Sequence, residues 1–144
     1  MGFTLRGLSW DEESFRAYVS TLNLSWANSV TIHHTYFPDL EMRRNGWNQT
    51  HLENLHHYYK NVLGWSAGPH LFTDDKKTFG LSSLQSRGVH AVSFNKNSIG
   101  IEMLGNYDEE DPKSGRGLEV VTLTSKTVAI LLEKMDTMAT EETV

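Results

Sequence analysis

The spacing of apolar residues along the chain predicts three helices separated by short strands. Apolar side chains recur at helical spacing in residues 11–22, in the run before Gly64 and near the C-terminus, and each run follows a Ser or Thr that suits a helix start. The expected buried faces are Phe15, Val19 and Leu22, then Leu52, Leu55, Tyr59 and Val62, and finally Val128, Leu131, Leu132 and Met135. The expected helix starts are capping boxes at Ser9–Glu12 and Thr50–Glu53, and Thr124 for the last helix.

Short apolar runs bounded by Asp, Lys, Gly and Ser predict the strands. These runs are residues 29–35, 69–75, 77–82 and 97–105. The acidic, glycine-containing segment 106–117 is typical of an exposed loop. Together the elements predict an α/β fold, a small mixed β-sheet flanked by helices, in a single domain over residues 1–144.

Composition narrows the functions that this domain can have. A net charge of −5 offers no basic surface for nucleic acid. The absence of cysteine excludes disulfides and thiolate ligands, so histidine and carboxylate side chains remain as candidate metal ligands. The first ten residues hold no apolar stretch of signal-peptide or transmembrane length, so we expect synthesis in the cytoplasm and no membrane partner.

Two adjacent histidines, His33 and His34, end the first long strand. Successive side chains of a strand point to opposite faces of the sheet, so the two histidines cannot both serve one site. One of them is a candidate for chemistry, while the other packs. A strand histidine also commonly serves only as a hydrogen-bonded core or surface residue.

Three motifs resemble those of one known family. They are "VTIHHT" at residues 30–35, "GWSAGPHLF" at residues 64–72 and "RGVHAVSFNKNSIGIEMLGNYD" at residues 87–108. The chain is similar, from about Ser29 to Met135, to the zinc-dependent N-acetylmuramoyl-L-alanine amidases, which include amidase-type phage lysozymes and the peptidoglycan recognition proteins. The resemblance implies a peptidoglycan substrate, cleaved between N-acetylmuramic acid and L-alanine by a zinc-activated water. It also suits a phage endolysin that reaches the cell wall after release from the cytoplasm.

The resemblance implies a role for particular residues. His33 matches a zinc ligand, and Glu102 matches a carboxylate that passes a proton from the water to the leaving amine. An exposed strand carboxylate in a salt bridge is the alternative for Glu102. The candidate substrate-contacting residues are His34, His70, His90, Asn95 and Asn97. Of these, His34 is also expected to be a structural neighbour on the opposite face, and the asparagines are equally suited to shaping a turn. Pro69 stands where many relatives have a catalytic tyrosine, which places the proton transfer on Glu102.

The zinc site implied by the family needs two more ligands, a His and then a Cys or Asp, after the last helix. No histidine follows His90 in this sequence. Three explanations are open. The chain is a C-terminally incomplete amidase whose remaining ligands lie beyond residue 144 in a missing segment, or it is a zinc-free module that binds peptidoglycan, or His70 and His90 form a different metal site with His33. We favour the first, because the residues around Glu102 match the family in full.

Overall fold

The computed structural model describes residues 5, 7–91 and 95–143, with side chains to residue 139. The strands are β1 (Ser9–Trp10), β2 (Ser29–His34), β3 (Leu71–Thr73), β4 (Thr78–Gly80) and β5 (Ser98–Met103). The helices are α1 (Glu12–Ser20), α2 (Gln49–His57), continued by a π-helical turn η1 (Tyr58–Val62), and α3 (Gly115–Thr143). The predicted α/β fold class and all four predicted strands are confirmed, whereas the two-residue strand β1 was not predicted.

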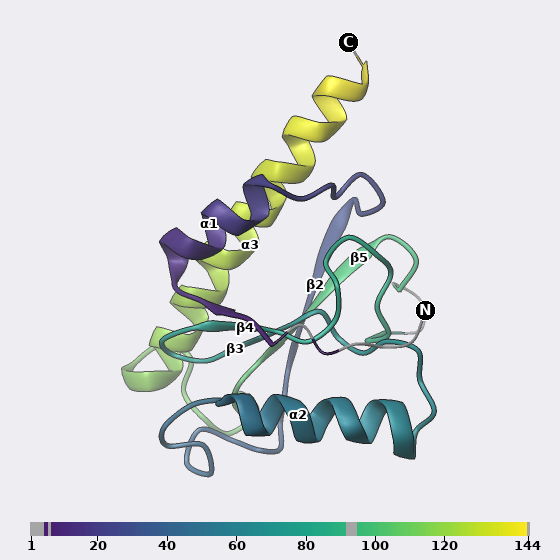
Figure 1. The fold of residues 1–144 in the computed structure, drawn as a ribbon. Coiled ribbons are helices and arrows are strands. Elements are labelled where there is room, and N and C mark those ends of the chain that lie inside the picture. Colours follow the sequence, from purple (N-terminus) through teal and green to yellow (C-terminus); the bar gives the residue numbers. More distant parts are fainter. Residues whose placement is uncertain (1–4, 6, 92–94, 144) are drawn as a thin grey trace.

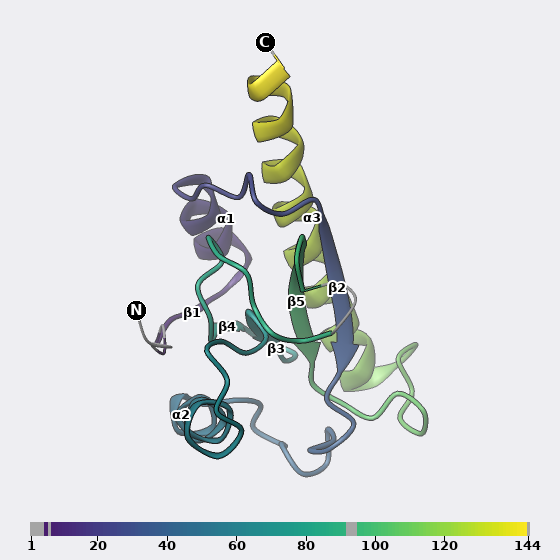
Figure 2. The ribbon, with the colours of Figure 1, turned by 90° about the vertical axis from the view of Figure 1, so that its right-hand side faces the viewer.

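The five strands form one mixed sheet in the order β1-β4-β3-β5-β2. β5 runs parallel to both of its neighbours, β2 and β3, whereas β4 is antiparallel to β3 and β1. Helices α1 and α3 lie on one side of this sheet and α2 lies on the other (Figure 1, Figure 2). The protein is therefore a three-layer α/β/α structure.

Each face of the sheet has its own hydrophobic core. The core under α1 and α3 includes Phe15, Leu71, Ile101 and Leu131. The core under α2 is built around Leu52, Trp47, Phe72, Phe79, Leu81 and Leu104. Because side chains alternate along a strand, neighbours such as Leu71 and Phe72 enter different cores. This alternation decides which polar side chains of β2 and β5 face α2.

The first two helices begin at other residues than the sequence predicted. The observed N-caps are Asp11, whose carboxylate accepts from the Ser14 backbone N–H, and Asn48, whose amide oxygen accepts from the His51 backbone N–H. Asp and Asn accept these bonds as well as Ser or Thr does, and each lies just before the first helical residue. The boxes predicted at Ser9–Glu12 and Thr50–Glu53 were therefore wrong by two residues each.

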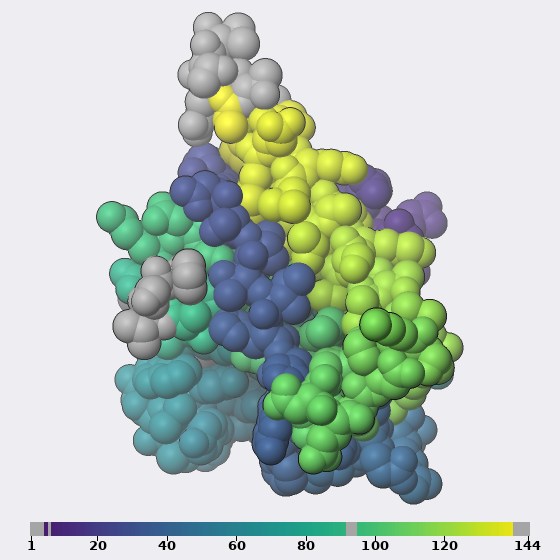
Figure 3. Space-filling model, turned by 180° about the vertical axis from the view of Figure 1, so that it is seen from behind, coloured from purple at the N-terminus to yellow at the C-terminus, as the bar shows by residue number. Residues whose placement is uncertain are grey.

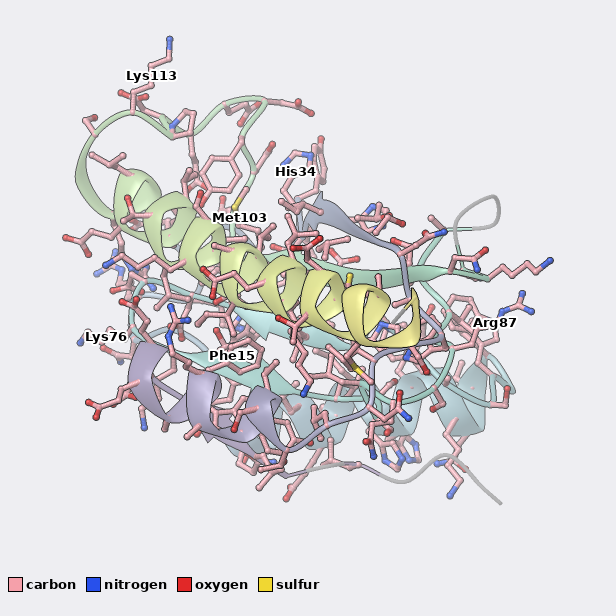
Figure 4. All side chains as sticks on the ribbon, turned by 90° about the horizontal axis from the view of Figure 1, so that it is seen from above. Phe15, His34, Lys76, Arg87, Met103 and Lys113 are labelled. Carbon is pink, nitrogen blue, oxygen red and sulfur yellow. The ribbon has the colours of Figure 1, made fainter. Side chains whose placement is uncertain are left out.

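The third helix begins at Gly115, nine residues before the predicted cap at Thr124. Thr124 lies inside the helix, where its hydroxyl bonds the Val120 carbonyl oxygen and the Thr73 hydroxyl. The glycines at 115 and 117 suggested a loop, but Val120 is fully buried and holds the first turns of the helix against the sheet. The remainder of the predicted loop is irregular, and Lys113 stands out from it into solvent (Figure 4).

Two residues predicted as buried are exposed. Val62 is 62% exposed because it lies in η1, where the wider π turn rotates it away from the stripe that Leu52 begins. Leu132 is 45% exposed because the adjacent Leu131 takes the core position. Among the described residues, no helix is long and apolar enough to span a membrane.

Candidate functional site

His33, Glu102 and His90 lie together on the face of the sheet that α2 covers. His33 is directly opposite Glu102 in the parallel β2–β5 register, and Glu102 is directly opposite Phe72 of β3. Phe72 belongs to the core under α2, so Glu102 and His33 share that face. All three polar side chains of the site are only partly buried, which leaves them accessible to a ligand.

The two imidazoles of this site approach each other through one nitrogen of each ring. His33 Nε2 lies 3.3 Å from His90 Nδ1, and the ring centroids are 5.6 Å apart. His90 Nε2 lies 3.0 Å from the Ser98 carbonyl oxygen, which can only accept, so Nε2 carries the proton. His90 Nδ1 therefore presents a lone pair towards His33. Burial lowers the pKa of both imidazoles below their usual value, and His90 lowers that of His33 further, so both rings are neutral at pH 7.

The Asn95 side chain holds the backbone that carries His90. The Asn95 side-chain oxygen accepts from the backbone N–H groups of His90 and Ala91, at 2.8 Å each. Asn95 therefore shapes the turn that holds His90, which is the structural alternative left open by the sequence. The Asn97 side chain is exposed. Residues 92–94 of the motif lie outside the described residues.

Gly100 of β5 lies directly under the His90 ring. A Cβ atom at residue 100 would approach His90 Cγ to 2.2 Å, so the ring position requires glycine there. We expect Gly100→Ala to lower the free energy of unfolding by about 1–3 kcal/mol, because the ring or the strand must move. Chemical denaturation measures this change.

A double variant provides the control for that prediction. Removing the ring in Gly100→Ala/His90→Ala relieves the overlap, so the two effects are expected to be non-additive in a double-mutant cycle. Additive losses would show that the ring does not set the requirement for glycine.

His70, a predicted substrate contact, is not accessible to a substrate in this structure. It is fully buried, and both ring nitrogens bind the backbone: Nδ1 accepts from the Gly100 N–H at 3.0 Å, and Nε2 donates to the Ser86 carbonyl at 2.8 Å. Burial lowers its pKa to about 4, and protonation of Nδ1 would break the bond to Gly100. The structure thus places His70 beneath the site as a support, and the hypothesis that it joins a metal site with His33 and His90 is wrong.

His34 lies apart from the site, as the alternation of β2 predicts. Its Nδ1 accepts from the Tyr107 backbone N–H at 3.0 Å, and its ring lies edge-on to Tyr36. It is paired in register with Met103, and the two lie at the strand ends near α3 (Figure 4). His34 therefore points away from the face that carries His33 and Glu102, and its contact with substrate stays a prediction.

Glu102 is electrostatically the most perturbed acid described. Burial raises its pKa to about 7, so the carboxyl is half protonated near neutral pH. Its negative charge also acts on Tyr59 of η1, whose pKa burial and Glu102 raise to about 12. Tyr59 stacks on Trp65, with ring centroids 5.3 Å apart, and a Cβ atom at residue 68 would approach its ring to 3.0 Å.

The sequence predicted Tyr59 only as a core residue of the second helix and not as part of the site. It is half-buried against the α2 core, and its neutral phenol lies within electrostatic range of Glu102. Helical periodicity predicted its inward direction but not the acid beneath it, because that pairing joins segments more than forty residues apart.

The described residues do not complete a metal site. No group of three or more His, Cys, Asp or Glu side chains in the described part of the chain is arranged to hold an ion. A catalytic zinc normally takes three protein ligands and a water. His33 and His90 supply two imidazoles joined by one hydrogen bond, which is fewer ligands than such a site needs.

Comparisons with known proteins identify the family and the fold of the chain. Residues 24–132 match a family model described as N-acetylmuramoyl-L-alanine amidase. Among solved structures, the chain is similar to a tyrosine-to-phenylalanine mutant of Drosophila PGRP-LB in complex with tracheal cytotoxin, with 19% identity and a TM-score of 0.53 over 89% of this chain and 70% of that one. No curated protein matches the chain.

Proposed function

Because the chain belongs to the N-acetylmuramoyl-L-alanine amidase family, we propose that it hydrolyses the amide between N-acetylmuramic acid and L-alanine in bacterial peptidoglycan. Glu102 carries the proposal. A carboxyl whose pKa is raised to about 7 is suited to take a proton from water and return it to the leaving amine at neutral pH. Its place opposite His33, on the partly open α2 face, puts this proton carrier beside the candidate metal ligand.

The side chains around Glu102 would prepare it for this role. The neighbouring Phe72 and the α2 core exclude water from part of the carboxyl, which raises its affinity for a proton. Tyr59 stays protonated at neutral pH, so its hydroxyl can donate a hydrogen bond there. The parallel hydrogen-bonded register fixes the spacing of His33 and Glu102, so substrate binding need not assemble the pair.

A zinc ion bound at His33 remains part of the proposal. Such an ion supplies a Lewis acid and lowers the pKa of a bound water to near 7. The described residues supply too few ligands for this complete site, so we derive no catalytic step through zinc. The full zinc site would need ligands from outside the residues that the structure describes.

A zinc-free peptidoglycan-binding module is the second candidate function. The incomplete metal site favours this function, since no group of three metal-binding side chains is found among the described residues. Binding would need only the partly exposed face around His33, His90 and Glu102. In both functions the protein would act on the cell wall, after release from the cytoplasm where it is made.

One experiment separates these functions. The purified chain is mixed with insoluble cell-wall sacculi, with and without added zinc, and both co-sedimentation and newly exposed L-alanine amino groups are measured. Co-sedimentation with zinc-dependent release of amino groups supports the amidase. Co-sedimentation alone supports the binding module, and a chain that does neither contradicts the proposed function.

Zinc retention gives a separate prediction. Because the described residues form no group of three ligands, the chain is expected to lose zinc on dialysis and to retain well below one ion per molecule. Elemental analysis with a protein assay measures the ratio. One ion retained per chain after dialysis against a weak chelator would show that this chain completes the site by itself.

A further inference from the structure

We propose that a pocket beside the start of α2 is a binding site for a carboxylate anion, with Arg43 as the residue that holds it. The pocket has a volume of about 410 Å³ and is lined by residues 41–46, Asn48 and His51, where the chain enters α2 (Figure 1). It shares no lining residue with the candidate site around Glu102. The proposal therefore goes beyond the proposed function.

Arg43 carries a positive charge that no acidic side chain in the described part of the chain neutralises. It forms none of the ion pairs between described residues, and its Nε–H is buried with no hydrogen-bond partner. A buried N–H without a partner costs free energy, so such groups are rare in folded proteins. The guanidinium lies 5.8 Å from the centre of the Trp47 ring, which attracts a cation but carries no negative charge. An anion in the pocket would supply the missing countercharge.

His51 adds a second donor to the same pocket. Its Nδ1 accepts from the Asn48 backbone N–H at 3.1 Å, so Nε2 carries the proton of the neutral ring. Burial lowers the pKa of His51, and the charge of Arg43 lowers it further, so the ring is neutral at pH 7. The hydrogen bonds of His51 within the described chain use its backbone N–H and Nδ1, which leaves Nε2–H for a ligand.

The acidic groups near the pocket are already paired. Glu41 lines the pocket, but its carboxylate forms an ion pair with Arg44. The buried Asp74 carboxylate accepts from the backbone N–H groups of Trp47 and Lys77, at 2.9 and 2.7 Å. The pocket therefore keeps one unpaired positive charge, which matches a singly charged carboxylate better than a doubly charged phosphate. The planar guanidinium also matches the geometry of a carboxylate, which accepts two parallel hydrogen bonds from it.

The backbone around the pocket is fixed before a ligand arrives. The Arg43 carbonyl oxygen accepts from Arg116 Nη2 at 2.6 Å and from the Gly46 N–H at 2.9 Å. Gly46 has a φ of +75°, and a Cβ atom there would approach the Asp74 carboxylate to 2.3 Å, so the turn requires glycine. Trp47 next to it is buried, with 5% of its surface exposed. A ligand therefore binds without the cost of ordering this loop.

Titration of the full 144-residue chain with sodium acetate, at an ionic strength held constant with sodium chloride, tests the proposal. We expect a saturable shift of the His51 Nε2 resonance, and an acetate affinity about tenfold lower in Arg43→Gln, because the charge-assisted bonds are lost. Arg16→Gln is the matched control. It removes an exposed guanidinium from α1, on the other side of the sheet, and should bind acetate as the wild type does.

Three results of this titration would overturn the proposal. They are wild-type affinity in Arg43→Gln, no saturable shift in the wild-type chain, and tighter binding of inorganic phosphate than of acetate. A second measurement covers an Arg43 variant that does not fold. In the wild-type chain, acetate is expected to shift the Nε resonance of Arg43 and to leave that of Arg16 unchanged, and an unmoved Arg43 resonance would overturn the proposal. None of these titrations contains peptidoglycan, so their results are independent of the proposed function.

The carboxylate has two sources that a further arm distinguishes, a free organic acid and the peptides of the cell wall. Arg43→Gln, Arg16→Gln and the wild-type chain are each sedimented with sacculi. Weaker sedimentation of Arg43→Gln alone assigns the site to a wall peptide, and equal sedimentation of all three assigns it to a free acid. Only this arm rests on the proposed function.

Discussion

Glu102→Gln is expected to lower the rate of amide hydrolysis about 10²–10⁴-fold, the usual contribution of a positioned acid–base group. Gln has nearly the same shape but cannot take a proton from water or deliver one to the leaving amine. Glu102 is suited to both steps because burial holds its pKa near 7, where the two protonation states are equally populated. The measurement is the initial rate of amino-group release from sacculi in the presence of zinc.

The control for this variant is Glu119→Gln, which changes an exposed carboxylate on α3, on the other side of the sheet. We expect it to keep the wild-type rate. Sedimentation with sacculi should be the same for both variants, because the change at Glu102 affects proton transfer more than binding. A rate for Glu102→Gln within fivefold of wild type would remove Glu102 from the mechanism.

The second large effect concerns pH and stability. Glu102→Gln in metal-free protein is expected to lose about 2 kcal/mol of unfolding free energy between pH 6.5 and pH 4.5, whereas the wild-type chain loses much less over the same range. The cause is that the pKa values of His70 and Glu102 are shifted in opposite directions over nearly the same pH range. The variant removes the contribution of Glu102 to the pH dependence and leaves that of His70 uncompensated.

The signs follow from which state binds the proton. His70 has a pKa of about 4 when folded and about 6.5 when unfolded, so between these values the unfolded chain binds the extra proton and stability falls as pH falls. Glu102 has a pKa of about 7 when folded and about 4.5 when unfolded, so there the folded chain binds the extra proton and stability rises as pH falls. The two slopes nearly cancel from pH 4.5 to 6.5. His33 and His90, whose pKa values are also lowered, act in the direction of His70.

Urea unfolding at several pH values, with a chelator present, measures both slopes. Glu119→Gln again serves as the control and should follow the wild-type curve. Parallel curves for wild type and Glu102→Gln would mean that Glu102 titrates at its ordinary pKa in the folded protein, and the case for it as a proton carrier would be lost with it.

The sequence predicted the elements better than their ends. Phe15, Val19 and Leu22 were identified as one buried face, and all three are buried, because apolar periodicity reports the core directly. Helix starts were less predictable. Asp and Asn cap helices as well as Ser and Thr do, so the sequence does not select Asp11 and Asn48 over their neighbours. The direction in which the chain enters the helix selects them.

The site was predicted in part. Alternation along β2 separated His33 from His34, and the structure gives the two histidines different neighbours for that reason. The contact between His33 and His90 joins residues 57 positions apart, and no local pattern contains it. The same holds for His70, because its burial depends on backbone groups of Gly100 and Ser86 that arrive from other segments.

β2 has a neighbour on one side only among the described strands, and it lies at the molecular surface beside α3 (Figure 3). In a parallel pair, alternate residues turn their backbone groups towards the neighbour, so about half of the β2 amides face outwards. We expect those amides to exchange with solvent deuterium much faster than the amides of β5, which is hydrogen-bonded on both sides. The two halves of the site thus differ in rigidity. Glu102 is held by hydrogen-bonded strands on both sides, whereas His33 lies on a strand that β5 alone holds in the described sheet.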